Sequence, residues 1–560
     1  MRSTNAPRGG LQKRAWLCAL VGMAALLLTV TLVSCGKEET TTTAAPATTA
    51  VTTATTLGPT GSTASTEVST TTVQLVKGGK IRWILMSLPQ VFYYPETSPS
   101  DHQGLMPGIE RLLVLNSNRQ LTPQLAESIE EDPDNLTFTI HVRKGVKLHD
   151  GSQFDASLLK WILEELKKAG KLNWGRCYES VEVKDPYTVV VHVSEWNNAM
   201  LADLGQVPVF SKEALDKNGV EWCRAHFVGT GPFMMKEFNR DQNLVWVRNP
   251  DYWQKDEGLP YLDEIEFLFI PDSNTAKTAM EAGEIDVWGG PADDLLSEMQ
   301  AKGLVLQSSW VGRFVMLVPN LVDPGSPFQN QKVREALDYA LDREALTEAL
   351  GYGIQMPVYE FSAPGHWGYG AGASTKREYD PQKARQLLAE AGYPNGLSVN
   401  LLAMTLAGGG NIWGEAIKGY LDAAGFKVTL DIADAGRYFG SIFGTGWKDL
   451  VLFTVAGYNQ ANDLLDLAYV WNALPSATNW ASWKPPQELA NLFAEALVLR
   501  DIKAMEAKVG DIVALMSKEA LVCPVSYASA PALMQPWVHI NYPACGIWYA
   551  DFAHAWVGKH

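Results

Sequence analysis

The sequence predicts a mixed α/β protein with at least two lobes. About 480 of its 560 residues follow Lys77, more than one hydrophobic core normally organises. Strand-like and helix-like patterns alternate along this stretch. Apolar and polar residues alternate from Leu136 to Val142 as in a strand, and residues 157–169 have helical spacing. This rhythm is typical of α/β lobes.

The amino terminus predicts export and a membrane tether. Four basic residues and no acidic one precede an apolar run from Ala15 to Val30, which is the pattern of a secretory signal. The run is short for a permanent membrane span. It ends at Leu32-Val33-Ser34-Cys35, which resembles the bacterial lipobox, so we expect residues 1–34 to be removed and Cys35 to be lipidated. The alternative is an uncleaved anchor. Either places the body outside the cytoplasm, at the cell membrane.

A Thr/Ala/Ser-rich stalk over residues 35–76 is expected to separate the anchor from the body. Residues 36–76 contain no aromatic side chain and cannot bury a core. The chain has a net charge of −16, and its first 34 residues carry four positive charges and no negative one, so the mature body reaches −20. Such a charge argues against nucleic acid or anionic lipid as a partner.

Four cysteines remain after the signal and Cys35 are set aside: Cys177, Cys223, Cys523 and Cys545. In an oxidising compartment they permit two disulfides, with three possible connectivities. A zinc site is the rival, but no pair has CxxC spacing or an adjacent histidine, and we expect no metal and no cofactor.

Six strings occur in a fixed order along the body and resemble the family-5 (peptide, nickel and related solute) substrate-binding proteins of ABC importers. They are Leu125–Ser128 with Arg143–Gly151, Val228–Phe233, Arg248–Trp253, Glu281–Asp286, Lys332–Arg343, and Tyr379–Pro394. The resemblance implies a two-lobed, periplasmic-binding-protein-like (type II) clamp with an extra subdomain inserted in the first lobe. Such lobes close over a solute at hinges where the chain crosses between them.

The resemblance also suggests boundaries. We expect a first lobe over residues 77–317, with the inserted subdomain at about 111–228, a second lobe over 318–520, and a return to the first lobe over 521–560. The crossings are placed near Phe314–Asn320 and Leu521–Ser526, in extended apolar segments. With these lobes, Cys177–Cys223 and Cys523–Cys545 are the expected disulfides, since each pair stays within one lobe.

The implied function is capture of a small solute, with a peptide-like one favoured, and delivery to an ABC permease and ATPase complex by a monomeric protein. In peptide-binding relatives an acidic residue just after a strand holds the ligand's ammonium group. Here that position falls on Gly457 or Tyr458, neither of which is acidic, and Asp463 substitutes only if the loop is rebuilt. This departure keeps oligosaccharides and metal chelates open as ligands.

Aromatic residues in the expected cleft loops are the remaining ligand candidates. They are Phe92, Tyr93, Tyr94, Trp413, Trp447 and Tyr458. Their faces suit planar or apolar ligand groups, although core packing explains each one equally simply. His149, within one of the six strings, has no second metal ligand nearby in sequence and is expected to be structural.

Two other functional classes compete with transport. A secreted hydrolase on the same anchor has no GxSxG, HExxH or P-loop string behind it, although a scattered carboxylate pair of the glycosidase type stays open. We therefore expect a protein without catalytic residues. A sensory accessory that uses the same clamp is the third possibility.

Overall fold

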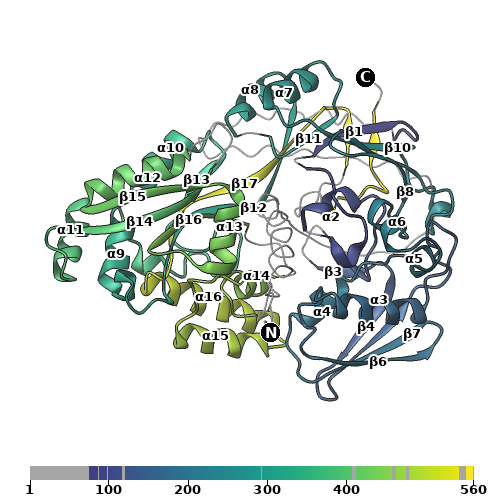
Figure 1. Ribbon diagram of the computed structural model, residues 1–560, viewed down its shortest axis with the longest axis horizontal. Helices are drawn as coiled ribbons and strands as arrows, with labels where there is room; N and C mark the ends of the chain where they lie inside the picture. Colours follow the sequence, from purple (N-terminus) through teal and green to yellow (C-terminus); the bar gives the residue numbers. More distant parts are fainter. Residues whose placement is uncertain are drawn as a thin grey trace, which may run out of the picture.

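The computed structural model describes residues 75–85, 87–97, 99–116, 120–291, 293–405, 411–456, 462–474, 479–540 and 550–558. The predicted signal peptide, Cys35, the stalk up to Gln74, Tyr458 and Cys545 lie outside these residues. Figure 1 shows two lobes side by side, joined by long strands. Within the described ranges, no helix is both long enough and apolar enough to cross a membrane.

One large mixed sheet runs through both lobes, with the strand order β15-β14-β16-β12-β17-β11-β1-β10-β9-β8, and β13 pairs with β17. The first-lobe strands are β1 (Lys80–Leu85), β8 (Phe233–Asn239), β9 (Asn243–Arg248), β10 (Glu264–Phe269) and β11 (Val287–Gly289). The second-lobe strands are β13 (Gln355–Pro357), β14 (Leu397–Met404), β15 (Phe426–Ala433) and β16 (Leu450–Ala456). In the second lobe β14 runs parallel to both β15 and β16.

The two lobes are joined by β12 (Val305–Pro319) and β17 (Cys523–Met534), an antiparallel pair. Val305 pairs with Met534 on the first-lobe side and Leu317 with Cys523 on the second-lobe side. The register shifts between Ser308 and Gly312, where the strands pass from one lobe to the other. Both predicted crossings fall on or next to these strands.

The predicted positions of the crossings, however, lie too far into the second lobe. Phe314 and Val525, one in each predicted crossing, are buried in the second-lobe core. The passage itself lies nearer the first lobe, at about residues 308–312 and 529–531. An extended apolar segment has the same sequence pattern in a core strand and in a crossing strand, so periodicity alone does not separate the two.

A separate four-stranded antiparallel sheet lies within the range predicted for the inserted subdomain. Its order is β4 (Ala126–Asp132), β5 (Thr137–Val142), β7 (Thr188–Val193) and β6 (Tyr178–Asp185). Helix α3 (Ala156–Lys168) packs against it through an apolar face that includes Leu159 and Leu163. Asp155 caps this helix by accepting a hydrogen bond from the Leu158 N–H.

Helices cover the remaining faces of the sheets (Figure 1). In the first lobe they are α2 (Pro99–Leu105), α4 (Met200–Gly205), α5 (Lys212–Asn218), α6 (Val220–Ala225), α7 (Ser273–Glu281) and α8 (Leu296–Ala301). In the second lobe they are α9 (Gln331–Tyr339), α10 (Arg343–Leu350), α11 (Pro381–Glu390), α12 (Ile412–Ala423), α13 (Ala435–Gly440), α14 (Asp463–Val470), α15 (Gln487–Leu497) and α16 (Ile502–Lys518). Short strand pairs complete the fold: β2 (Leu113–Leu115) with β3 (Leu121–Pro123), and β18 (Val538–His539) with β19 (Trp556–Val557).

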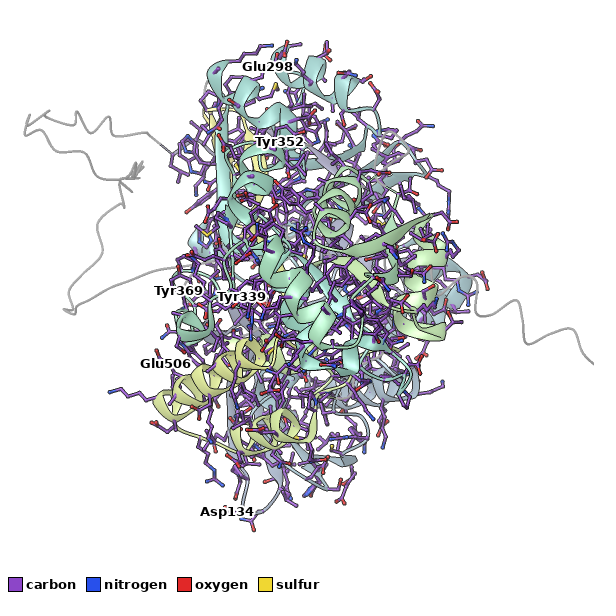
Figure 2. All side chains as sticks on the ribbon, turned by 90° about the vertical axis from the view of Figure 1, so that its left-hand side faces the viewer. Asp134, Glu298, Tyr339, Tyr352, Tyr369 and Glu506 are labelled. Carbon is purple, nitrogen blue, oxygen red and sulfur yellow. The ribbon has the colours of Figure 1, made fainter. Side chains whose placement is uncertain are left out.

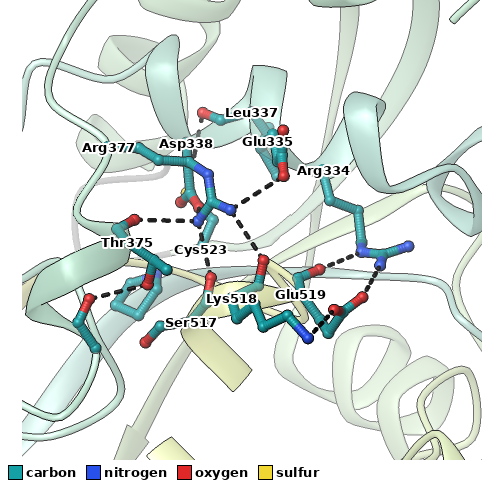
Figure 3. A network of polar contacts seen from close by, with 12 residues as sticks. Arg334, Glu335, Leu337, Asp338, Thr375, Arg377, Ser517, Lys518, Glu519 and Cys523 are labelled. Carbon is teal, nitrogen blue, oxygen red and sulfur yellow. Dashed lines mark hydrogen bonds and ion pairs between the residues drawn. The ribbon is translucent and has the colours of Figure 1, made fainter. Parts of the chain in front are cut away.

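Buried arginines fasten the helices of the second lobe to the strand that enters it. Arg343 donates to the Asp338 carboxylate at 2.8 Å and to the backbone oxygen of Pro524, in β17, at 2.7 Å. Arg377 donates to the backbone oxygens of Ser517 and Lys518, the last residues of α16 (Figure 3). The Ser517 oxygen also accepts from the Ala520 N–H at 3.2 Å and the Lys518 oxygen from the Gln331 side chain at 3.1 Å, so the arginine adds a further donor at the helix end, where carbonyls lack partners within the helix. The string from Lys332 to Arg343 therefore has a structural role.

Candidate ligand-binding cleft

The lobes touch a second time, away from the crossing strands, where α4 of the first lobe meets the second. Ala199 and Ala202 pack into the hydrophobic core of the second lobe. The backbone N–H of Asn198 donates to the backbone oxygen of Leu497 at 2.9 Å, and its side-chain amide donates to that of Leu499 at 3.1 Å. Asn198 thus supplies donors to carbonyls at the end of α15, which a helix leaves unpaired.

A tyrosine–carboxylate pair crosses the same contact. The Tyr469 hydroxyl in α14 donates to the Asp203 carboxylate in α4, and Asn173 donates to its other oxygen at 3.2 Å. Burial raises the pKa of Asp203 from 3.8 to about 6. The cavity beside the pair, lined by Trp174 and Leu474 among others, has a volume of only about 10 Å³. That is room for roughly one water, so the lobes meet here directly.

An exposed ion pair extends the contact outward. Arg500 of the second lobe lies 3.0 Å from the Asp134 carboxylate, and its guanidinium lies 5.7 Å from the centre of the Trp196 ring. Asp134 projects from one end of the molecule, beyond the helical layer of the second lobe (Figure 2). Because both charges are largely exposed, the pair contributes little stability on its own.

Between the crossing strands and the α4 contact lies the edge of the second lobe where β14 and β16 end. These parallel strands end at Met404 and Ala456, so the chain leaves both at the same edge. Helices α12 and α14 begin nearby in the chain, capped by the side chains of Asn411 and Asn462. In open α/β sheets, ligands bind outside the carboxyl ends of parallel strands. This edge, facing the first lobe, is the candidate ligand-binding cleft.

Asp463 is buried in the protein interior. Its carboxylate accepts hydrogen bonds from the His366 ring at 3.2 Å and from the Trp367 backbone N–H at 2.6 Å. The residue is 1% exposed. It fastens the loop at residues 366–367 to the start of α14, which gives it a structural role in place of the expected contact with a ligand ammonium group.

Both second-lobe tryptophans predicted to face the ligand are buried in the core: Trp413 in α12 and Trp447 before β16. The prediction that Trp413 and Trp447 face the ligand is therefore wrong. The prediction for Tyr458 lies outside the described residues.

The ring of Trp447 starts a buried aromatic row through the second lobe. Trp480 lies 6.1 Å from Trp447, centroid to centroid, and Trp471 lies 5.5 Å from Trp480. The row continues through Phe361, 4.8 Å from Trp471, to Phe314 of β12 at a further 4.4 Å. The aromatic residues of this row therefore pack into the core of the second lobe and do not form a binding surface.

The first-lobe aromatics Phe92, Tyr93 and Tyr94 also make packing contacts. Phe92 lies 4.9 Å from Phe238 of β8, on the edge of the sheet opposite the second lobe. Tyr94 stacks on His102 at 4.7 Å. The Tyr93 hydroxyl donates to Glu165 at 3.4 Å, and burial together with this carboxylate raises the pKa of Tyr93 to about 12. All these partners belong to the first lobe, so the core interpretation explains the three residues.

The described cysteines are free thiols. Cys177 and Cys223 are both buried, and the Cys177 thiol donates to Glu195 at 3.1 Å. Cys523 is also buried and free, and it accepts a hydrogen bond from Arg343 at 3.3 Å. The predicted Cys177–Cys223 disulfide is therefore wrong, because loop length in the sequence does not bring two side chains together. The predicted Cys523–Cys545 disulfide involves Cys545, which lies outside the described residues.

Two further motif residues brace the first lobe. The Tyr252 hydroxyl donates to the Glu110 carboxylate at 2.9 Å, and the Trp253 indole N–H donates to it at 3.0 Å. Burial raises the pKa of Glu110 to about 7 despite these donors. His149 accepts from the Gly229 N–H at 3.2 Å and donates to the Gly231 oxygen at 3.0 Å. Its role is thus the expected structural one.

Burial also lowers the pKa of His149 to about 4, which keeps its ring neutral. Across the described part of the chain, no group of three or more His, Cys, Asp or Glu residues is arranged to hold a metal ion.

Comparison with known proteins agrees with this architecture. The model of the bacterial extracellular solute-binding proteins, family 5, matches residues 120–472. The chain belongs to this family. The glutathione-binding protein GsiB of Salmonella paratyphi A is 30% identical over 403 residues, which cover 70% of this chain and 76% of GsiB.

Solved structures share the fold. The periplasmic binding protein DppA of Helicobacter pylori, in complex with the peptide STSA, has a TM-score of 0.73 and 23% identity, covering 86% of this chain and 99% of DppA. NikA of Brucella suis, in complex with Fe(III)-EDTA, has a TM-score of 0.70 and 22% identity, covering 86% of this chain and all of NikA. The family-5 solute-binding protein is thus the extracytoplasmic, ligand-capturing component of an ABC importer.

The residues at the contact between the lobes were not found from the sequence. Asn198, Asp203 and Tyr469 lie outside the six family strings, and neither their spacing nor their residue types differ from an ordinary surface. Only the assembled lobes bring residues 198–203 next to residues 469–500.

Proposed function

We propose that this protein captures a peptide-like solute between its lobes and delivers it to the permease of an ABC importer. The observation that carries the proposal is the arrangement of the two lobes: two strands join them on one side, α4 touches the second lobe on another, and the carboxyl ends of β14 and β16 lie between. The glutathione-binding relative and the peptide-bound structural neighbour support a peptide-like ligand.

The test is native mass spectrometry followed by calorimetry. The purified protein is mixed with an equimolar library of di- to tetrapeptides and with reduced glutathione, and the bound masses are read from the complex. We expect a one-to-one complex with a library member, which calorimetry then confirms in isolation. A complex only with an oligosaccharide or Fe(III)-EDTA, offered in parallel, would replace the peptide assignment. A bound peptide recovered as fragments would indicate a hydrolase.

The proposal includes a monomer that is tethered through a lipid on Cys35 and held off the membrane by the stalk over residues 35–76. The lipobox-like string supports the anchor, because several acyl chains on one cysteine bind a membrane stably whereas a single chain binds only marginally. In fractionated cells we expect Cys35→Ala to leave the membrane pellet with its body folded. Retention of this variant in the pellet after a carbonate wash would remove the lipid anchor from the proposal.

A further inference from the structure

The contact between α4 and the second lobe combines three kinds of interaction. Asn198 donates to carbonyls at the end of α15, Asp203 accepts from Tyr469, and Asp134 pairs with Arg500. The first two of these interactions are partly buried, and the third is exposed. Contacts between lobes that form only when a clamp is closed favour the closed state by their whole free energy.

We infer that these residues form a lobe latch, made of Asn198 and Asp203 of the first lobe with Tyr469 and the 497–499 carbonyls of the second, which holds the clamp closed and slows ligand release. Nothing in the family assignment places a role on these residues. The inference rests on the proposed function only for the nature of the ligand; the closure that it describes is a property of the lobes themselves.

The latch residue of the second lobe stands next to the aromatic row that reaches the crossing strands. Trp471 follows Tyr469 by two residues and is linked by ring contacts through Phe361 to Phe314 of β12. Phe314 in turn lies 5.0 Å from Tyr527 of β17. Because a close-packed row of rings moves as a unit, the latch surface and the crossing strands belong to one rigid body. Opening the latch therefore means rotating the whole second lobe.

The latch also links closure to protonation, because closing buries the Asp203 carboxylate. The open clamp exposes Asp203 with its ordinary pKa, and the closed clamp holds it at about 6. Closing between pH 4 and 6 thus takes up a proton, so the closed state gains as the pH falls. From pH 7 to pH 5 the gain in the closing equilibrium is about tenfold.

The groups around Asp203 do not reverse this direction. Tyr469 keeps its proton, since burial raises its pKa well above the ordinary value. Arg176 and Cys177 line the same cavity, and both contact the Glu195 carboxylate, Arg176 at 2.9 Å. Asn173 remains neutral throughout.

Hydrogen–deuterium exchange tests the latch without any ligand. The Asn198 amide donates across the lobes to Leu497, so its protection factor in peptides covering 196–200 reports closure. We expect Tyr469→Phe to lower that factor about twofold at pH 7, because it removes a partly buried hydrogen bond to a carboxylate from a clamp that is open about half of the time without ligand. Tyr252→Phe is the matched control: it removes the same kind of bond within the first lobe. Asn198 protection should stay unchanged in this control.

A second variant provides the pH readout. Wild-type protection at Asn198, corrected for intrinsic exchange, should rise about fivefold from pH 7 to pH 5, and Asp203→Asn should abolish the rise. Equal protection in wild type and Tyr469→Phe, an equal loss in Tyr252→Phe, or an unchanged pH response in Asp203→Asn would each overturn the latch. Failure to bind any peptide, with these exchange results intact, would overturn the proposed ligand and leave the latch standing.

Discussion

Two tyrosine–carboxylate pairs in this protein, one buried and one partly buried, have the same chemistry and different surroundings. Glu110 accepts from Tyr252 and Trp253 inside the first lobe. Asp203 accepts from Tyr469 across the two lobes. Burial raises the pKa of both carboxyl groups, to about 7 and about 6. The first pair exists whenever the lobe is folded, whereas the second exists only when the clamp is closed.

The difference separates two uses of one interaction. The free energy of the Glu110 pair belongs to folding, because Tyr252 and Trp253 both pack within the first lobe. The free energy of the Asp203 pair belongs to the equilibrium between open and closed lobes. Changes at the first pair should therefore alter stability and leave binding intact, and changes at the second should do the reverse.

The largest expected effect is on folding. Glu110→Ala leaves the Trp253 indole N–H without an acceptor, leaves the Tyr252 hydroxyl only Gln254 Oε1, at 2.9 Å, and opens a cavity, so we expect a loss of about 4 kcal/mol in the free energy of unfolding. Guanidinium denaturation followed by tryptophan fluorescence measures it. Glu110→Gln, which keeps the volume and an acceptor oxygen, is the control and should lose much less. A loss below about 1 kcal/mol in the alanine variant would contradict a bracing role.

The pH dependence of stability comes next. The pKa of Glu110 is higher in the folded protein, about 7, than its ordinary value of 4.5, so the folded state binds the proton more tightly. The stabilisation is complete below pH 4.5 and is lost as the pH rises to about 7, which amounts to about 3 kcal/mol. Comparing wild type with Glu110→Gln between pH 4.5 and 8 isolates this contribution. Parallel stability curves for the two proteins would assign the pH dependence to other groups.

Measuring both stability and ligand affinity on the two tyrosine variants should show smaller effects. Tyr252→Phe should cost about 1.5 kcal/mol of stability with ligand affinity unchanged. Tyr469→Phe should leave the free energy of unfolding of the unliganded protein within about 0.5 kcal/mol and weaken binding of the peptide found by mass spectrometry about fivefold. Calorimetry and denaturation on both variants give the four numbers. If both variants lose stability to the same extent, the two pairs have the same role and the comparison fails.

The smallest expected effect concerns the exposed end of the contact. Arg500→Ala removes the ion pair with Asp134, which is exposed on both sides, and should weaken ligand binding less than about twofold. In wild type, this contribution should disappear in 1 M salt, where charges are screened beyond about 3 Å. Titrations at low and high salt measure it. An effect on binding as large as that of Tyr469→Phe would show that the exposed ion pair contributes as much to closure as the Tyr469 hydrogen bond does.

The sequence predicted those features that depend on local pattern. The helix at residues 157–169 corresponds to α3, and the strand from Leu136 to Val142 corresponds to β5. The six strings also identified the family, because many of their residues make fixed local contacts, as Asn249 does by accepting a hydrogen bond from the Asp251 N–H at 3.0 Å. These interactions depend on residue type and short-range geometry, which a sequence displays directly.

The site was harder to predict because it depends on contacts between distant segments. Trp413 and Trp447 have the composition of a binding surface, yet the second lobe uses them to fill its core. Asp463 lies close in sequence to the position where an acid was expected, but His366, 97 residues away, forms a hydrogen bond with its carboxylate. Asp203 and Tyr469 are 266 residues apart, and nothing in the sequence around either residue indicates that they are in contact. Only the tertiary structure assigns these side chains their roles.

The account's central claim is that the lobes close over a bound solute, and small-angle X-ray scattering tests it most directly. The purified protein, stripped of ligand by partial unfolding and dialysis, is measured alone and with a saturating amount of the peptide identified by mass spectrometry. The account predicts that the radius of gyration decreases on saturation, and that Tyr469→Phe needs more peptide to reach the same compact state. An unchanged radius of gyration at full occupancy, in wild type and variant alike, would contradict closure.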